Sequence, residues 1–113
     1  MAVFNGAFPI LEGKEDAARA FASETIGARK AEFEALQARS NVTRETWAMQ
    51  ETPMGSFMLV WFEGDVEHAF SDLAADNSEF ATWFRAQVKD LTGVDLGAPL
   101  EGPLPDVLVN WQG

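Results

Sequence analysis

The chain has 113 residues, of which 18 are Asp or Glu and 8 are Lys or Arg, so its formal net charge is −10. This length predicts one domain, residues 1–113, with one core. The negative charge repels phosphate backbones and anionic lipids, which argues against nucleic acid or a membrane as a partner. The chain contains no cysteine, which excludes disulfide scaffolds, thiolate metal sites and cysteine nucleophiles.

The compartment is predicted from the absence of targeting and spanning patterns. Residues 1–6 show no basic start followed by an apolar run, and no stretch approaches the ~18 apolar residues of a membrane span. We therefore expect a cytoplasmic protein.

The first third of the chain predicts a strand followed by a long helix. Residues 3–11 alternate between two faces as a strand does, and Pro9 places the end of this strand near a sheet edge or a bulge. Residues 15–39 are rich in Ala, Glu, Arg and Lys and contain no proline, which favours a helix. Gly27 lies inside this stretch, so we expect the helix to bend or break there.

Two further strands follow, joined by a tight turn. Residues 43–52 predict a strand with one polar face, and the sequence Thr-Pro-Met-Gly at 52–55 is typical of a hairpin turn. Residues 56–62 predict the central strand, which is apolar on both faces: Met58, Val60 and Phe62 on one, Phe57, Leu59 and Trp61 on the other. Helices cover one face of such a sheet, so we expect a second copy of the chain to cover the other.

The second half predicts two helical segments, a loop and a last strand. Asp65 is a suitable N-cap for the first segment, Ser78 caps the second, and Gly93 is a natural residue after a helix end. Residues 94–105 hold three prolines and two glycines and predict a crossing loop. Residues 105–111 then predict a final strand.

The predicted order is strand, helix, strand, strand, helix, strand. This order is typical of the α+β ferredoxin-like fold, a four-stranded antiparallel sheet with its helices on one face. Because the other face of the central strand is apolar, we expect the protein to form a homodimer through the open face of the sheet.

A family resemblance rests on two stretches of the sequence. Residues 60–70, VWFEGDVEHAF, together with 80–96, FATWFRAQVKDLTGVDL, resemble the strand-to-helix signature of the dimeric α/β-barrel superfamily, which includes antibiotic-biosynthesis monooxygenase-like proteins and related uncharacterised bacterial proteins. The resemblance implies a dimeric α/β barrel. It also implies several activities: oxygenation without metal or flavin, haem degradation, and lactone or dehydration chemistry.

The resemblance allows the haem-degrading activity to be checked against single residues. That activity would need an Asn on the first strand and a Trp and a His on the second helix. Asn5 matches, but Leu73 and Trp83 occupy the other two positions. We therefore expect no haem. We also expect no other cofactor and no metal.

The candidate site is a pocket between sheet and helices. We expect its apolar wall to come from Trp47, Met49, Trp61, Phe70, Trp83 and Phe84, with Asn5 or His68 as the polar contact. This pattern favours a binding protein for an apolar small molecule, either fatty-acid-like or polyketide-like.

Two alternatives stay open, so the sequence does not decide whether the protein is an enzyme. The first is a cofactor-independent monooxygenase or isomerase of an apolar or aromatic metabolite, for which a base is required; His68 and Asp72 lie at helical spacing i, i+4. The second is a non-catalytic dimeric assembly protein, in which the aromatic residues simply fill the core.

Overall fold

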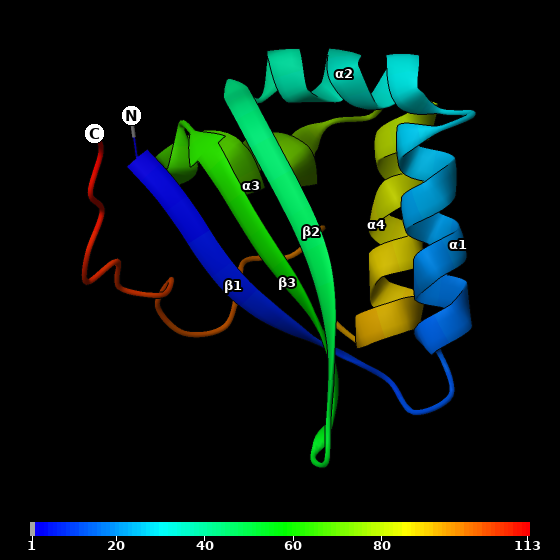
Figure 1. Cartoon of the computed structure of the whole chain (residues 1–113). Coiled ribbons are helices and arrows are strands. Elements are labelled where there is room, and N and C mark those ends of the chain that lie inside the picture. Colours follow the sequence, from blue (N-terminus) through cyan, green and yellow to red (C-terminus); the bar gives the residue numbers. More distant parts are fainter. Residues whose placement is uncertain (1) are drawn as a thin grey trace.

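Four helices cover one face of a three-stranded antiparallel sheet in the computed structural model, which describes residues 2–113 (Figure 1). In this part of the chain the elements are, in order, β1 (Ala2–Ile10), α1 (Glu15–Ile26), α2 (Lys30–Arg39), β2 (Val42–Thr52), β3 (Gly55–Gly64), α3 (Val66–Ala75) and α4 (Glu79–Thr92). The α+β class predicted from the sequence is confirmed.

The strand that the sequence places at the centre is central in the sheet. The strand order is β1-β3-β2, and β3 pairs antiparallel with both neighbours. Residues two apart on β3 therefore share a face. Met58, Val60 and Phe62 point toward the helices, whereas Phe57, Leu59 and Trp61 lie on the opposite face, which we call the outer face.

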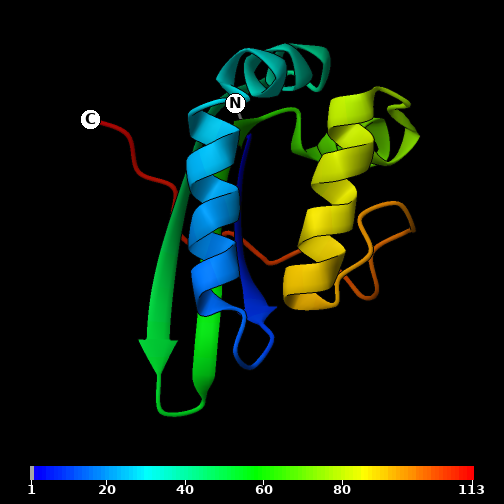
Figure 2. The ribbon, with the colours of Figure 1, turned by 90° about the vertical axis from the view of Figure 1, so that its right-hand side faces the viewer.

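The long predicted helix is broken at Gly27, as expected. Helix α1 ends at Ile26 and α2 starts at Lys30 in a different direction (Figure 1). A Cβ atom at Gly27 would lie 2.6 Å from the carbonyl oxygen of Ser23, so only glycine lets the chain turn so closely past α1. Helices α1 and α4 then lie side by side on the sheet (Figure 2).

Three predicted helix ends are confirmed. The Asp65 carboxylate accepts a hydrogen bond from the backbone N–H of His68, and the Ser78 hydroxyl accepts one from that of Ala81. Gly93 follows α4 in the left-handed conformation, with φ of 79°. These local signals separate α3 from α4 and fix where each begins.

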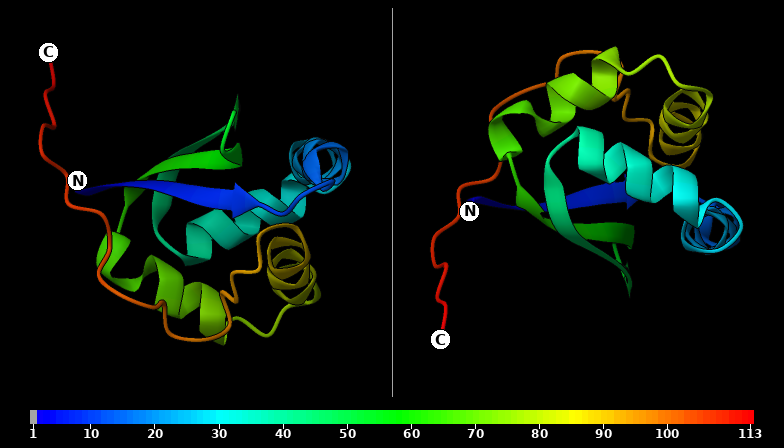
Figure 3. Two further views of the ribbon diagram at one scale, coloured as in Figure 1. Left: turned by 90° about the horizontal axis from the view of Figure 1, so that it is seen from below. Right: turned by 90° about the horizontal axis from the view of Figure 1, so that it is seen from above.

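The predicted strand at 105–111 is wrong, and with it the four-stranded ferredoxin-like sheet. Within the described residues, none after Thr92 belongs to a helix or strand. The loop from Leu96 to Leu104 runs over α3, and Leu96 is buried in the core. The segment after the loop leads away from the domain instead of running back along β1 (Figure 3).

Candidate functional site

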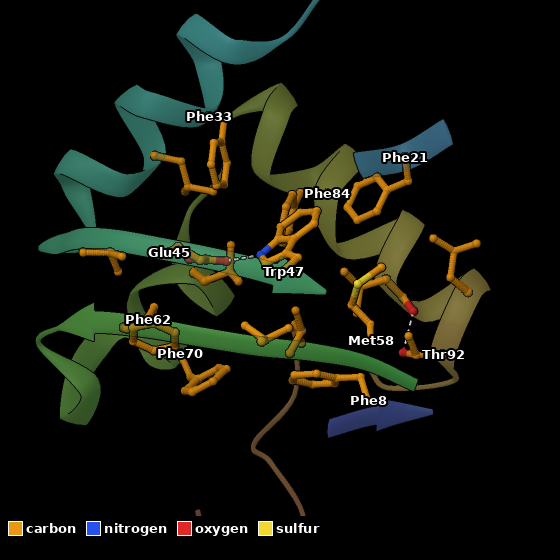
Figure 4. Close-up of a pocket in the computed structure, with 18 of the residues that line it drawn as sticks. Phe8, Phe21, Phe33, Glu45, Trp47, Met58, Phe62, Phe70, Phe84 and Thr92 are labelled. Atoms are coloured by element: carbon orange, nitrogen blue, oxygen red, sulfur yellow. Dashed lines mark hydrogen bonds between the residues drawn. The ribbon is translucent and has the colours of Figure 1, made fainter. Parts of the chain in front are cut away.

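An apolar cavity of about 110 Å³ lies between the inner face of the sheet and the helices (Figure 4). All three strands and all four helices of residues 2–113 contribute side chains to it. Its walls are mainly aromatic and aliphatic, as in most small-molecule sites. The larger lining residues are Phe8, Ile10, Phe21, Phe33, Leu36, Trp47, Met58, Val60, Phe62, Phe70, Leu73, Phe84, Val88, Leu91 and Leu96.

The charged group in this lining is the carboxylate of Glu45, on β2. Gln37 of α2 donates a hydrogen bond of 2.8 Å from Nε2 to Oε1, and the indole N–H of Trp47 donates to Oε2. Glu45 and Trp47 are two residues apart on one strand, so their side chains lie on the same face (Figure 4). The carboxylate is thus held at a fixed place in the cavity wall.

The environment of Glu45 disfavours its charge. Burial raises the pKa of the Glu45 carboxyl above its ordinary value, although the hydrogen bonds from Trp47 and Gln37 act in the opposite direction. A carboxyl group among apolar side chains loses the hydration that stabilises its ionised form, and two donors replace that hydration incompletely.

Trp47 connects the carboxylate to the aromatic wall. Its ring stacks on Phe21 of α1 at 5.5 Å and 22°, and it contacts Phe84 of α4 at 5.9 Å. On the opposite side of the cavity, Phe70 of α3 packs edge-on against Phe62 of β3 at 5.8 Å. Packing between aromatic rings fixes both sides, so the cavity is a preformed space.

Three of the residues proposed as pocket lining from the sequence contact this cavity. These are Trp47, Phe70 and Phe84. Met49, two positions after Trp47, packs against the core beside the cavity without lining it. Trp83 does not line the cavity. It packs against Phe21, and the guanidinium carbon of Arg29 lies 4.4 Å from the centre of the Trp83 ring.

The other three proposed residues lie elsewhere. Asn5 and Trp61 are paired neighbours on the outer face, so the sheet separates them from the cavity. His68 is exposed at the start of α3, where its Nδ1 lies 3.0 Å from the carboxylate of Asp65. This hydrogen bond raises the pKa of His68, and the ring partner is Asp65 rather than Asp72.

Glu45 is the polar residue that the sequence-based interpretation missed. The signal was present in the alternation of β2, because Glu45, Trp47 and Met49 share one face. A lone carboxylate in line with two large apolar side chains indicates a charged group facing the core.

The outer face forms a second candidate surface, because none of the described helices covers it (Figure 3). The outer face is mainly uncharged. Charged residues make up 23% of the sequence, but on this face they are confined to Arg44 and Glu63 at one end of the sheet. The guanidinium of Arg44 lies 5.6 Å from the ring centre of Trp61. The face consists of Val3, Asn5, Ala7, Pro9, Arg44, Thr46, Ala48, Gln50, Phe57, Leu59, Trp61 and Glu63.

Metal and membrane sites are not found in the described part of the chain. Residues 2–113 contain no cluster of three or more His, Asp or Glu side chains that could hold a metal ion. None of the helices in this range is long and apolar enough to cross a membrane.

Comparison with protein-family models, curated proteins and solved structures finds no match for this chain. The resemblance to the dimeric α/β-barrel superfamily therefore stays a prediction. What the protein does has to be inferred from the cavity and the outer face.

Proposed function

We propose that the protein binds a small, mainly apolar molecule in the cavity, with Glu45 as its polar contact. The observation that carries this proposal is a carboxylate held by Trp47 and Gln37 in a mainly apolar wall. Binding sites for small molecules combine an apolar surface with a few fixed polar groups in this way. A core that served only for stability would gain little from a costly buried charge.

The cavity narrows the class of ligand expected from the sequence. An engineered cavity of about 150 Å³ binds benzene, and this one measures about 110 Å³. It therefore suits a single ring or a short chain, whereas a long fatty acid or a polycyclic polyketide exceeds this volume. The Glu45 carboxylate repels anions and accepts hydrogen bonds, so a neutral ligand with a hydroxyl group is preferred.

Phenol is a suitable probe because it has one ring and one hydroxyl group. We expect it to shift the ¹⁵N–¹H resonance of the Trp47 indole, which donates to Glu45, and benzoate to leave that resonance unchanged. Ala69→Leu fills the cavity, because Ala69 is part of its lining, and it should abolish the shift. Ala86→Leu on the exposed surface of α4 is the matched control. A wild-type protein that shows no shift at saturating phenol would overturn the proposal.

We further propose that two copies associate through the outer face, which supports a role in assembly as a second function. The observation in its favour is that Phe57, Leu59 and Trp61 form an apolar strip with no cover from the described helices. Soluble monomers rarely leave a continuous apolar patch in water unless it has a partner. This association would also produce the homodimer that the superfamily resemblance implies.

The area of the outer face alone is small for a stable dimer. We therefore expect the C-terminal segment to add to the contact area. Three strands at about 4.8 Å spacing and about 3.4 Å per residue present on the order of 450 Å², about half of the ~800 Å² that each partner buries in a standard interface. The segment after residue 104 is apolar and exposed: Leu108, Val109 and Trp111 are 90%, 83% and 82% accessible. We propose that it packs on the second copy and supplies the missing contact area.

A further inference from the structure

We propose that Glu45 acts as an acid–base group that moves a proton between two carbon atoms of a small neutral ketone bound in the cavity. The inference rests on the proposed binding function and adds a reaction to it. Three observations carry it: where the carboxylate lies, how it is held, and which donors surround it.

The carboxylate of Glu45 lies where a bound molecule would meet it. It belongs to the lining of the cavity together with Phe33 and Leu36 of α2 and Phe62 of β3 (Figure 4). A ring occupying the cavity would therefore have its C–H groups next to a carboxylate oxygen. A general base has to lie within hydrogen-bond reach of the proton that it removes, and this arrangement meets that condition.

The two donors fix the carboxylate without using up its oxygens. Each carboxylate oxygen has two lone pairs, and Gln37 and Trp47 each occupy one of them, on different oxygens. One lone pair per oxygen stays available to receive a proton. Burial also raises the pKa of Glu45, which makes its carboxylate a stronger base than an exposed one.

Polar groups for the oxygen of the substrate lie beside the base. Removing a proton next to a carbonyl group leaves negative charge on the carbonyl oxygen, and that charge needs a hydrogen-bond donor. The Gln37 amide has a second N–H, and Ser40 also lines this part of the cavity. Both come from the C-terminal part of α2 and its cap.

The proposed step is balanced and needs no other reactant. The substrate is a ketone with a carbon–carbon double bond between its β and γ carbons. The C–H bond on the α carbon, between this double bond and the carbonyl group, breaks; its proton goes to Glu45, and the electron pair enters the dienolate that forms. Glu45 then returns the proton to a different carbon, which forms a new C–H bond and moves the double bond into conjugation. Nothing is oxidised or reduced overall, and Glu45 ends in its starting state.

The probe is 3-cyclopenten-1-one, a five-membered ring that isomerises to 2-cyclopenten-1-one by this step. Proton NMR in D₂O follows both the isomerisation and the entry of deuterium. We expect Glu45→Gln to lower the rate at least about 100-fold, the usual contribution of a positioned base. Glu51→Gln is the matched control, because Glu51 is an exposed glutamate on the same strand, where it pairs with Arg19; its rate should equal that of the wild type.

Binding is measured separately through the Trp47 indole resonance, so the two proposals can fail separately. A ketone that shifts this resonance and is isomerised by the wild type, but not by Glu45→Gln, supports the inference. If the ketone binds but the wild type isomerises it no faster than Glu45→Gln does, the inference is overturned and the binding function is unaffected. A ketone that does not bind, when phenol does not bind either, overturns both.

Discussion

Glu45 is the residue whose ionisation should make the stability of the domain depend on pH. Its pKa is raised in the folded protein, mainly by burial, so the folded state prefers the protonated form. The contribution of this group to stability is therefore complete below the ordinary glutamate value of 4.5 and is lost as pH rises through the raised value.

The prediction is tested by comparing the wild type with Glu45→Gln, whose side chain cannot ionise. The free energy of unfolding of the wild type, minus that of Glu45→Gln, should fall as pH rises above 4.5. Urea unfolding followed by tryptophan fluorescence between about pH 4 and pH 8 measures this difference. A flat difference for Glu45→Gln would show that burial does not disfavour the charge of Glu45.

For single strand residues, the sequence indicated which ones share a face of the sheet, but not which face the helices cover. Trp61 and Trp47 were both plausible wall residues, and β-strand alternation is symmetric between the two faces. The choice depends on where the helices pack, which is a property of the whole domain. Trp47 therefore contacts the cavity while Trp61 lies on the outer face.

Strand β3 ends at Gly64, where the backbone of Asn41 and Val42 approaches it closely. A Cβ atom at Gly64 would lie 2.3 Å from the carbonyl oxygen of Asn41 and 2.8 Å from the Cα of Val42. Gly55, at the other end of the same strand, also has positive φ but has open space around it. Comparing alanine substitutions at these two glycines therefore separates the free-energy cost of a positive φ angle from the cost of a steric clash.

Gly64→Ala should destabilise the domain more than Gly55→Ala does. We expect the difference in the free energy of unfolding to be about 1–3 kcal/mol, the usual cost of forcing extra atoms into a packed site. Chemical unfolding of the two variants at one pH provides the measurement. Equal losses would mean that β2 can move away from Gly64 at no cost.

Elements with local signals were predicted well, and the element without one was not. The break at Gly27 and the caps at Asp65 and Ser78 depend on residues within one helical turn. The strand predicted at 105–111 has strand-like composition, but a strand also needs a partner edge. Whether it finds one depends on the path of the loop over α3, which the local sequence does not specify.

For the whole molecule, the outer face predicts a dimer that a single charge should disrupt. Leu59 lies in the middle of β3 on this face, between Ala7 and Ala48 of the neighbouring strands. In a dimer, Leu59→Glu would bury an unpaired carboxylate, which is strongly unfavourable. Met54→Glu, in the hairpin turn at a residue 91% exposed, changes the net charge equally and is the control.

Sedimentation velocity and native mass spectrometry should show a dimer for the wild type and for Met54→Glu, and a folded monomer for Leu59→Glu. Circular dichroism checks that the variant is folded. A wild-type monomer at micromolar concentration would contradict the proposal that a second copy covers the outer face.

Removing residues 105–113 separates the contribution of the C-terminal segment from that of the sheet. All of these residues are exposed, and none belongs to a helix or strand, so the domain itself should remain as stable as before. If the segment supplies the area that the outer face lacks, its loss should weaken the dimer at least about tenfold, which corresponds to about 1.4 kcal/mol. A shortened chain that dimerises as tightly as the wild type would show that the sheet face alone is sufficient. A shortened chain that loses stability would instead show that the segment packs on its own domain.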